Sequence, residues 1–357
     1  EDLCERYGLH TLRPLCSWGS WTRSLPHVRK GLKRGFTYFA SGRSLLVAGS
    51  PDDESGDTHW LREDVDLFLL EQAIAAGVEY RDQTEVHSAE GLGADLLIDA
   101  TGRSPRLSEE LGASDASDQL ATRTRGVWGH FSGVPRWEDR LTESARRDDP
   151  FRCDDAAVHH LLPDGSGWLW ALRFDHDVTS LGFVLDLAQP LAEALPGERP
   201  ADEWSRRLAA NPDLAGWLDA AQPTLPLASS GRLQRLARPA AGPGWAMLPS
   251  AAGFIDPLHS TGIAHTLRGV ERLARMLEGG LPSPKDLGEY AEVVIREILH
   301  IDHLVAGCYS ALRDRDVDRF FAFSKLYFAA AITSEHRRRA GAAGSEGAFL
   351  LADDPRF

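Results

Sequence analysis

The residues with the clearest chemical pattern lie between positions 245 and 263. An apolar run at 245–248 is followed by a loop rich in Pro, Gly and Asp, which ends at Ser260-Thr261-Gly262 before an amphipathic segment. This order predicts a strand, a small-residue loop and the start of a helix. Free backbone N–H groups and the helix dipole suit such a point to an anion or a cofactor tail. We expect Ser260 or Thr261 to cap the helix whether or not an anion binds.

A second short motif, Asp99-Ala100-Thr101-Gly102, closes the apolar run 94–100. Only two aspartates interrupt this run, which is typical of a strand buried on both faces. Small residues after such a strand allow a cofactor to approach the backbone closely. An ordinary strand-to-turn ending has the same appearance, so the motif alone leaves both interpretations open.

One lysine stands in a strand-like context. Lys33 precedes the alternating segment 35–39, and it follows the basic residues Arg29 and Lys30. A desolvated lysine is partly neutral and nucleophilic, which is the form that covalent or hydrogen-bonding chemistry requires. The alternatives are a solvated basic edge or a contact to a phosphate.

Two tryptophans and an arginine complete the candidates from the residues alone. In the run 167–172, period-2 alternation puts Trp168, Trp170 and Leu172 on one face of a strand, and taken alone the run favours an ordinary buried strand. Arg62 opens a predicted helix, where a guanidinium suits a phosphate.

We predict no metal site. His159-His160 and the run 175–177 are adjacent residues, which a strand points to opposite faces. The four cysteines form no C-x-x-C pair, and their scatter favours a reduced, cytoplasmic chain. The net charge of −14 argues against nucleic acid or an anionic membrane as a partner. No apolar run approaches the roughly 20 residues of a membrane span.

The elements that would position these residues alternate between helix and strand before turning β-rich and then helical. We predict strands in 27–50, a helix over 62–76 ended by Gly77, and a short strand at 78–80. Further strands are predicted at 122–133, 156–162, 167–174 and 180–186, with helical patches over 187–222. Helices follow after Gly262, with Ile263, Leu267, Val270, Ala274 and Leu277 on one face, and then over 284–312 and 315–338. The first eight residues read as the end of a helix with Gly8 as its C-cap, which predicts residues upstream of Glu1.

The segment 248–263 resembles the second flavin-contact motif of the flavin-dependent halogenases, G-D-A-A-G-F-x-D-P-x-x-S-T-G. Two positions depart from it, since Pro249 and Ser250 stand where the family has Gly-Asp. The D-A-T-G turn resembles the class A flavoprotein monooxygenases, and the run 167–172 resembles the halogenase signature W-x-W-x-I-P with Arg173 in place of proline. The resemblance runs from about residue 25 to 338, but no G-x-G-x-x-G occurs in the chain.

The resemblance implies roles for particular residues. It gives halide binding to Ser260, Thr261 and Gly262, and substrate gating to Trp168 and Trp170. It gives relay of the oxidised halogen to Lys33, because the segment 33–39 resembles the family's K-x-G-x-x-x-F. It assigns the flavin cofactor a larger set of contacts, namely Arg62, Asp99, Thr101, Gly102, Ser250, Gly253, Asp256, Pro257, Gly262 and Ile263.

The fold that it implies is α/β, with a doubly wound FAD-binding domain of the glutathione-reductase type. This domain would take residues 1–120 and 225–280, with its first βαβ unit missing. An inserted mixed β-sheet substrate domain would take 121–224, and a C-terminal helical region 281–357.

The implied activity is halogenation of an electron-rich substrate, free or tethered to a carrier protein, with FADH2 from a separate reductase, oxygen, and chloride or bromide. The reaction would pass through a flavin hydroperoxide and hypohalous acid. Two alternatives remain: a monooxygenase or reductase of the same fold, and a non-catalytic homologue that holds little flavin. The sequence indicates neither the substrate nor the oligomeric state.

Overall fold

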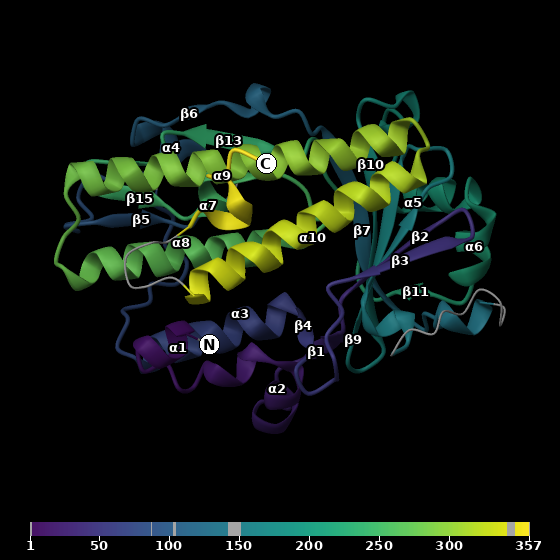
Figure 1. Cartoon of the computed structure of the whole chain (residues 1–357), viewed down its shortest axis with the longest axis horizontal. Helices are drawn as coiled ribbons and strands as arrows, with labels where there is room; N and C mark the ends of the chain where they lie inside the picture. Colours follow the sequence, from purple (N-terminus) through teal and green to yellow (C-terminus); the bar gives the residue numbers. More distant parts are fainter. Residues whose placement is uncertain (1, 87, 103–104, 142–150, 341–346, 357) are drawn as a thin grey trace. The chain divides into compact units, whose positions relative to one another are not determined.

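The computed structural model describes residues 2–86, 88–102, 105–141, 151–340 and 347–356 as a mixed α/β fold (Figure 1). The chain forms two compact units, and each is built from two separate stretches of sequence. Unit 1 contains residues 1–82 and 125–231, and unit 2 contains residues 83–124 and 232–357.

Unit 1 is built around an eight-stranded mixed sheet in the order β11-β7-β10-β9-β8-β2-β3, with β12 also paired to β7. β2 runs parallel to β8, whereas β2–β3, β8–β9 and β9–β10 are antiparallel pairs. The sheet confirms the predicted strands of this region. Its members are β2 (Phe36–Ala40), β3 (Arg43–Val47), β7 (Thr124–Ser132), β8 (Ala157–Leu161), β9 (Gly167–Phe174), β10 (Val178–Asp186), β11 (Gln222–Pro223) and β12 (Ala228–Ser229).

The two faces of this sheet carry different side chains because neighbouring residues of a strand point to opposite sides. On one face, Leu169 and Phe183 join a core that includes Trp204 and Trp217 from two helices, α5 (Pro200–Ala209) and α6 (Pro212–Trp217). Trp168 lies on the other face, fully buried. Alternation along β9 therefore separates the helix-covered core from the tryptophan side.

The rest of unit 1 is a smaller helical layer beside a two-stranded pair. β1 (Lys30–Lys33) pairs antiparallel with β4 (Asp57–Trp60), and α3 (Arg62–Ala75) follows directly. Trp21, Val28, Val65 and Phe68 form the core of this layer. The remaining elements of unit 1 are α1 (Asp2–Arg6), η1 (Arg13–Cys16), α2 (Trp18–Ser24), η3 (Glu138–Arg140), η4 (Cys153–Asp155) and η5 (Pro190–Ala192).

Unit 2 combines two small sheets with three long helices. β5 (Leu97–Asp99) runs parallel to β15 (Trp245–Met247), which also pairs with β14 (Ala241–Gly242). The second sheet has the order β16 (Gly253–Phe254), β13 (Arg235–Arg238) and β6 (Ser114–Asp115). The helices are α4 (Pro105–Glu110), η2 (Ser117–Gln119), α7 (Pro249–Ala252), α8 (Thr261–Glu278), α9 (Pro284–Arg313), α10 (Val317–Ala340) and η6 (Phe349–Leu351).

The long helices begin and end where their sequences predict. Ser283 accepts a hydrogen bond from the Asp286 N–H, and Asp286 in turn accepts from the Ser283 N–H, which is a capping box at the start of α9. Pro284 occupies the first turn, where its missing N–H costs nothing. In the described part of the chain, no helix is both long and apolar enough to cross a bilayer.

Two local predictions are wrong, and a third is right about the helix face but leaves that face exposed. Residues 78–80 form no strand, and Val78 and Tyr80 are exposed. The strand predicted over 94–100 is only the three residues of β5, and Ile98 is 41% exposed because β5 pairs on one side only among the described residues. On α8, the apolar side chains do share a face, but Ile263 and Leu267 are 41% and 45% exposed.

The compact units do not follow the predicted domain bounds. The predicted FAD-binding domain takes in residues 1–120, yet β2 and β3 lie in the large sheet because β2 pairs with β8. The compact units describe how the chain packs and assign no cofactor, so the domain functions stay a prediction.

Candidate functional site

The ends of two neighbouring parallel strands bring together the two motifs of unit 2. Asp99 pairs with Met247 in the β5–β15 register, and the Leu248 N–H donates to the Asp99 carbonyl at 2.9 Å. The turn 99–102 and the Pro249-Ser250 step therefore follow side by side at the carboxyl ends of their strands. This edge is where open α/β sheets bind ligands.

The Asp99 side chain is used within its own turn. It is 2% exposed, and its Oδ1 accepts from the Thr101 N–H at 2.8 Å and the Thr101 hydroxyl at 2.7 Å. Gly102 follows with a φ of 73°, a left-handed conformation that favours glycine. The motif thus forms a fixed turn that ends in exposed backbone.

Asp256 shapes the loop that leads to α8. Its carboxylate is buried and accepts from the Thr124 hydroxyl at 2.7 Å, the Tyr309 hydroxyl at 3.0 Å and the Leu258 N–H at 3.0 Å. Both oxygens therefore have protein donors. Any influence of Asp256 on a bound cofactor acts through the shape of the loop.

Glycine at 253 has a packing explanation. A Cβ there would lie 2.9 Å from Ile298 Cδ1 on α9 and 3.2 Å from the Arg235 carbonyl. Arg235 also binds the backbone carbonyls of Ser250 and Ala251 at the end of α7. Close packing of β16 therefore requires glycine, whatever the site binds.

The start of α8 differs from the expectation of a capped helix. Ser260 is the N-cap residue, but its φ of 52° is left-handed and its side chain makes no capping hydrogen bond. The Thr261 hydroxyl instead bonds to the Tyr327 hydroxyl. The prediction that the side chain of Ser260 or Thr261 caps α8 is wrong. The loop turns Ser260 out of capping geometry, and the Thr261 hydroxyl is bonded to Tyr327 instead of to the helix backbone. The first turn of α8 consequently keeps backbone N–H groups and a helix dipole without a side-chain cap.

In unit 1, Lys33 lies in a largely enclosed, aromatic setting. Its side chain is 11% exposed, and its Nζ lies 3.0 Å from Asp57 Oδ2 and 4.5 Å from the centroid of the Phe36 ring. The β1–β4 register places Lys33 directly opposite Asp57, which explains the pair. The charge and hydrogen bond of Lys33 hold the pKa of the exposed Asp57 carboxyl below its ordinary value.

The other basic residues near Lys33 each have a carboxylate partner. Lys30, 3% exposed, lies 3.5 Å from Asp175, and Arg29 lies 2.6 Å from Asp64. A solvated basic edge is therefore a poor description of this stretch.

Two buried histidines share the surroundings of Lys33. Burial, with a contribution from the Lys33 charge, lowers the pKa of His59 and of His159 to about 3. His159 stacks between Tyr38 and Trp168, with ring centroids 4.8 Å from each. Both imidazoles are therefore neutral at ordinary pH.

Trp168 and Trp170 lie on the same face of the large sheet, opposite to the core that contains Leu169, as the alternation predicts. Trp168 is fully buried, and the Trp170 indole N–H donates to the Ser180 hydroxyl at 3.0 Å. Arg173, which replaces the signature proline, donates to the carbonyls of Val134 and Pro135. It therefore ties β9 to the segment before η3.

Arg62 begins α3 as predicted. It forms a bidentate ion pair with Asp66 one helical turn later, and its side chain is 66% exposed. An exposed pair of this kind contributes little stability, so the guanidinium can exchange its partner for a phosphate.

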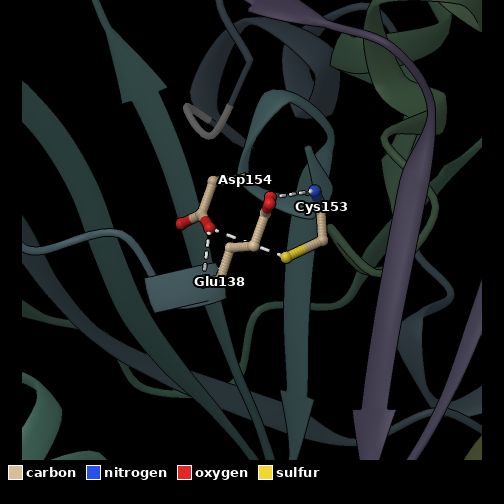
Figure 2. A group of neighbouring side chains, drawn as sticks. All are labelled: Glu138, Cys153 and Asp154. Atoms are coloured by element: carbon tan, nitrogen blue, oxygen red, sulfur yellow. Dashed lines mark hydrogen bonds between the residues drawn. The ribbon is translucent and has the colours of Figure 1, made fainter. Parts of the chain in front are cut away.

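A group of metal-ligand types in unit 1 escaped the sequence analysis: Glu138, Cys153 and Asp154 (Figure 2). Both oxygens of Asp154 and one oxygen of Glu138 already have donors in the protein. Asp154 accepts from the backbone N–H of Trp137 and of Glu138, each at 2.9 Å, and from the Cys153 thiol, while Glu138 accepts from the Cys153 N–H. The group fixes η3 against η4. Since the two segments are 15 residues apart, no local motif signals it.

Unit 2 holds a second buried group that sequence reasoning missed. Glu297 is fully buried and accepts from both Nη atoms of Arg272 at 2.7 Å, and its Oε2 lies 3.0 Å from His265 Nε2. Burial raises the pKa of Glu297, but the bonds from His265 and Arg272 outweigh it and lower the pKa to about 2. This group joins α8 to α9 and, through the Phe349 N–H, to η6.

Comparison with known proteins adds family information to this geometry. The model of the tryptophan halogenase family matches residues 70–325. The chain is 26% identical to monodechloroaminopyrrolnitrin halogenase PrnC of Pseudomonas fluorescens over 94% of its length, and 26% identical to tetracycline 7-halogenase of Kitasatospora aureofaciens over 62%. It spans 63% and 43% of the lengths of these two relatives.

A solved structure agrees in fold. The FAD complex of the L111Y mutant of halogenase PltM superposes with a TM-score of 0.83 at 21% identity, over 99% of this chain and 78% of that one. The expected α/β fold is therefore confirmed.

Proposed function

We propose that this chain, which belongs to the tryptophan halogenase family, takes part in the halogenation of an electron-rich organic substrate by reduced FAD, oxygen and chloride or bromide. The observation that carries the proposal is the start of α8. There, the loop 256–262 ends in a helical turn whose N–H groups have no side-chain cap. A halide ion meets the charge requirement of that turn.

The residues at the ends of β5 and β15 suit contact with FAD. A Cβ placed on Gly102 or Gly262 would meet no other heavy atom within 4 Å, so the backbone faces open space at both glycines. Ser250 is half-buried in α7, and it offers a neutral hydroxyl where the family has a carboxylate. When bound, reduced FAD supplies the activation of oxygen that oxidises the halide.

One part of FAD lacks its usual partner in this sequence. No G-x-G-x-x-G occurs in the 357 residues, so the diphosphate would not rest on that turn within this stretch. Arg62 is the residue that we assign to the diphosphate, in exchange for its exposed pair with Asp66. Pro257 and Ile263 complete the proposed flavin contacts.

The proposed roles of the remaining residues follow from their settings. The amides of Ser260, Thr261 and Gly262 hold the halide, and Lys33 directs the oxidised halogen to the substrate. Trp168 and Trp170 lie on the sheet face beside His159, and they keep the organic substrate away from the flavin.

A separate reductase that supplies FADH2 and a small or carrier-tethered substrate are the proposed partners. A cytoplasmic location belongs to the same proposal. All four cysteines are free thiols in the structure, which suits a reducing compartment.

The experiment supplies FADH2, oxygen and an aromatic substrate panel to the protein, with and without chloride. Product that forms only with chloride and carries chlorine supports the proposal. A hydroxylated product that forms equally without halide would instead select a monooxygenase, and a colourless protein without a flavin peak would select a non-catalytic homologue.

The monooxygenase is the second candidate because of two sequence departures. Pro249 and Ser250 replace the Gly-Asp of the motif, and Arg173 replaces the proline of W-x-W-x-I-P. The bonds of Arg173 to two backbone carbonyls, however, give it a structural role in β9. This weakens its value as a sign of altered chemistry.

Substitution of Gly262 by alanine tests the halide role. A methyl group there meets no other heavy atom within 4 Å, so we expect the fold to tolerate it. It stands next to the proposed halide position, and we expect the KM for chloride to rise about tenfold, which equals about 1.4 kcal/mol of lost binding. Gly288→Ala is the matched control, since Gly288 lies in α9 with equally open space around it. Equal chloride KM values in the two variants would contradict the assignment.

Substitution of Asp57 by asparagine tests how Lys33 is held. Asparagine keeps the size of the side chain but removes the charge that faces Nζ at 3.0 Å. Because the ion pair fixes the position of Nζ, we expect its loss to lower the rate of halogenated product about tenfold. The measurement is that rate under saturating FADH2 and halide. An unchanged rate would show that Asp57 does not hold Lys33 in place.

A further inference from the structure

A cavity of about 440 Å³ lies in unit 1, on the edge of the large sheet formed by β2 and β3. Phe39, Trp137 and His160 line it together with Leu214 at the start of α6, and Ala210 stands between α5 and α6. The volume falls in the range of small-molecule sites, which is about 300–1,000 Å³. None of the site residues described above lines it.

The cavity lies across the sheet from the surroundings of Lys33. Tyr38 and His159 stack on one face, at 4.8 Å, and their immediate neighbours Phe39 and His160 stack on the other, at 5.2 Å. Adjacent strand residues point to opposite faces, so the sheet separates the two groups of rings. A molecule in this cavity would therefore not be in reach of Lys33.

One part of the cavity wall is aromatic, and the charged residues Arg43, Asp164 and Asp213 line other parts of it. The ring centroids of Trp137 and His160 lie 4.3 Å apart, and Trp217 lies within 5.3 Å of both. His160 is 4% exposed, and burial lowers its pKa to about 3, so the imidazole is neutral. A neutral imidazole has one N–H donor and one nitrogen acceptor.

Two ring nitrogens in this wall have no hydrogen-bond partner among the described residues. They are the buried Nε1 of Trp137 and the buried Nε2 of His160. Leaving such a group unsatisfied is unfavourable, so the fold retains a cost that a bound polar group can relieve. Both atoms are enclosed by protein, and the cavity beside half-buried Trp137 gives its indole space to turn toward a ligand.

We propose that this cavity is a second binding site, for a small, uncharged, planar ring that carries a hydroxyl group. The flat ring stacks against Phe39, Trp137 and His160. The hydroxyl oxygen accepts from the Trp137 N–H once the indole has turned toward the cavity. This site does not depend on the halogenation proposed above.

The test uses 4-fluorophenol as the probe and follows its fluorine NMR signal in the presence of the whole protein. We expect saturable binding with a dissociation constant on the order of 1 mM, as suits a ligand of this size. Ala210→Phe, at an exposed position, fills the mouth of the cavity and should abolish this binding. Trp137→Phe keeps the ring but removes the donor, and should weaken binding about fivefold.

Trp18→Phe is the matched control. The Trp18 indole N–H is likewise buried without a partner among the described residues, but it does not line the cavity, so binding should be unchanged. Competition with cyclohexanol, which has the hydroxyl but no flat ring, should be at least about tenfold weaker than with phenol.

Three results would overturn the proposal: no saturable binding by the wild type, binding that survives both Ala210→Phe and Trp137→Phe, or equal competition by cyclohexanol and phenol. Near-ultraviolet circular dichroism verifies that each variant keeps its tertiary structure before binding is compared.

Discussion

Replacement of Lys33 by methionine is expected to reduce halogenated product by at least about 100-fold, which is the usual contribution of a single positioned nucleophile or acid–base group. Methionine matches the length and apolar character of the lysine stem but removes Nζ. Lys33 Nζ lies 4.5 Å from the centroid of the Phe36 ring, and an apolar methionine side chain suits this enclosed, aromatic position. The measurement is the rate of halogenated product under saturating FADH2 and halide.

Two further variants show whether the loss is specific. Lys33→Arg keeps the charge beside Asp57 but cannot become neutral at ordinary pH, so it should be about as inactive as Lys33→Met. Lys285→Met removes an exposed lysine of α9 that pairs with Glu289, and it should leave the rate unchanged. Full activity of Lys33→Arg would mean that charge alone is needed, and full activity of Lys33→Met would remove Lys33 from the mechanism.

Mild acid is expected to destabilise the protein strongly. His59, His159 and His160 are all at most 6% exposed, and burial lowers the pKa of each to about 3, against an ordinary 6.5. In the pH range between these values, the unfolded chain binds protons that the folded chain does not. The stability that these neutral histidines allow is therefore complete above pH 6.5 and falls as the pH drops toward 3.

The size of the effect follows from the shifts. At pH 5, each histidine costs about 2 kcal/mol of the free energy of unfolding, or on the order of 6 kcal/mol for the three. The measurement is urea unfolding, followed by tryptophan fluorescence, at pH 7.5 and pH 5. Buried carboxylates such as Glu297, with a pKa of about 2, still favour the folded state across this range.

Single variants separate the contributions. His160→Phe keeps the stacked ring but removes the titrating group, so it should lessen the difference between the two pH values by about a third. His303→Gln removes an exposed histidine and should change nothing. A free energy of unfolding that is equal at pH 7.5 and pH 5 would contradict the burial of these side chains.

The parts of the fold that sequence predicted are those with a regular, local pattern. In strands β7 to β10, apolar residues alternate with polar ones or form continuous runs between loops rich in Pro and Gly. The start of α9 is marked in the sequence by Ser283-Pro284. The missed features depend on distant partners. Residues 78–80 have strand-forming types but find no neighbouring strand, and Ile98 is exposed because β5 has a partner on one side only among the described residues.

The same distinction applies to the candidate site. Lys33 could be singled out by its segment, whereas its pairing with Asp57 depends on the register of β1 and β4. Ser260 has the type of a capping residue, but its left-handed backbone is set by the loop that Asp256 holds. The groups around Asp154 and Glu297 bring together side chains from separate segments, so no spacing in the sequence reveals them.

The central claim is that an oxidised halide reaches the substrate, and the most direct test is the mass of the product when bromide replaces chloride. The protein receives FADH2, oxygen and substrate in a chloride-free buffer, and each halide is then added alone. We predict a product with the chlorine isotope pattern in chloride and the bromine pattern in bromide, and no such product without halide. A product of the same mass in both salts would contradict the claim.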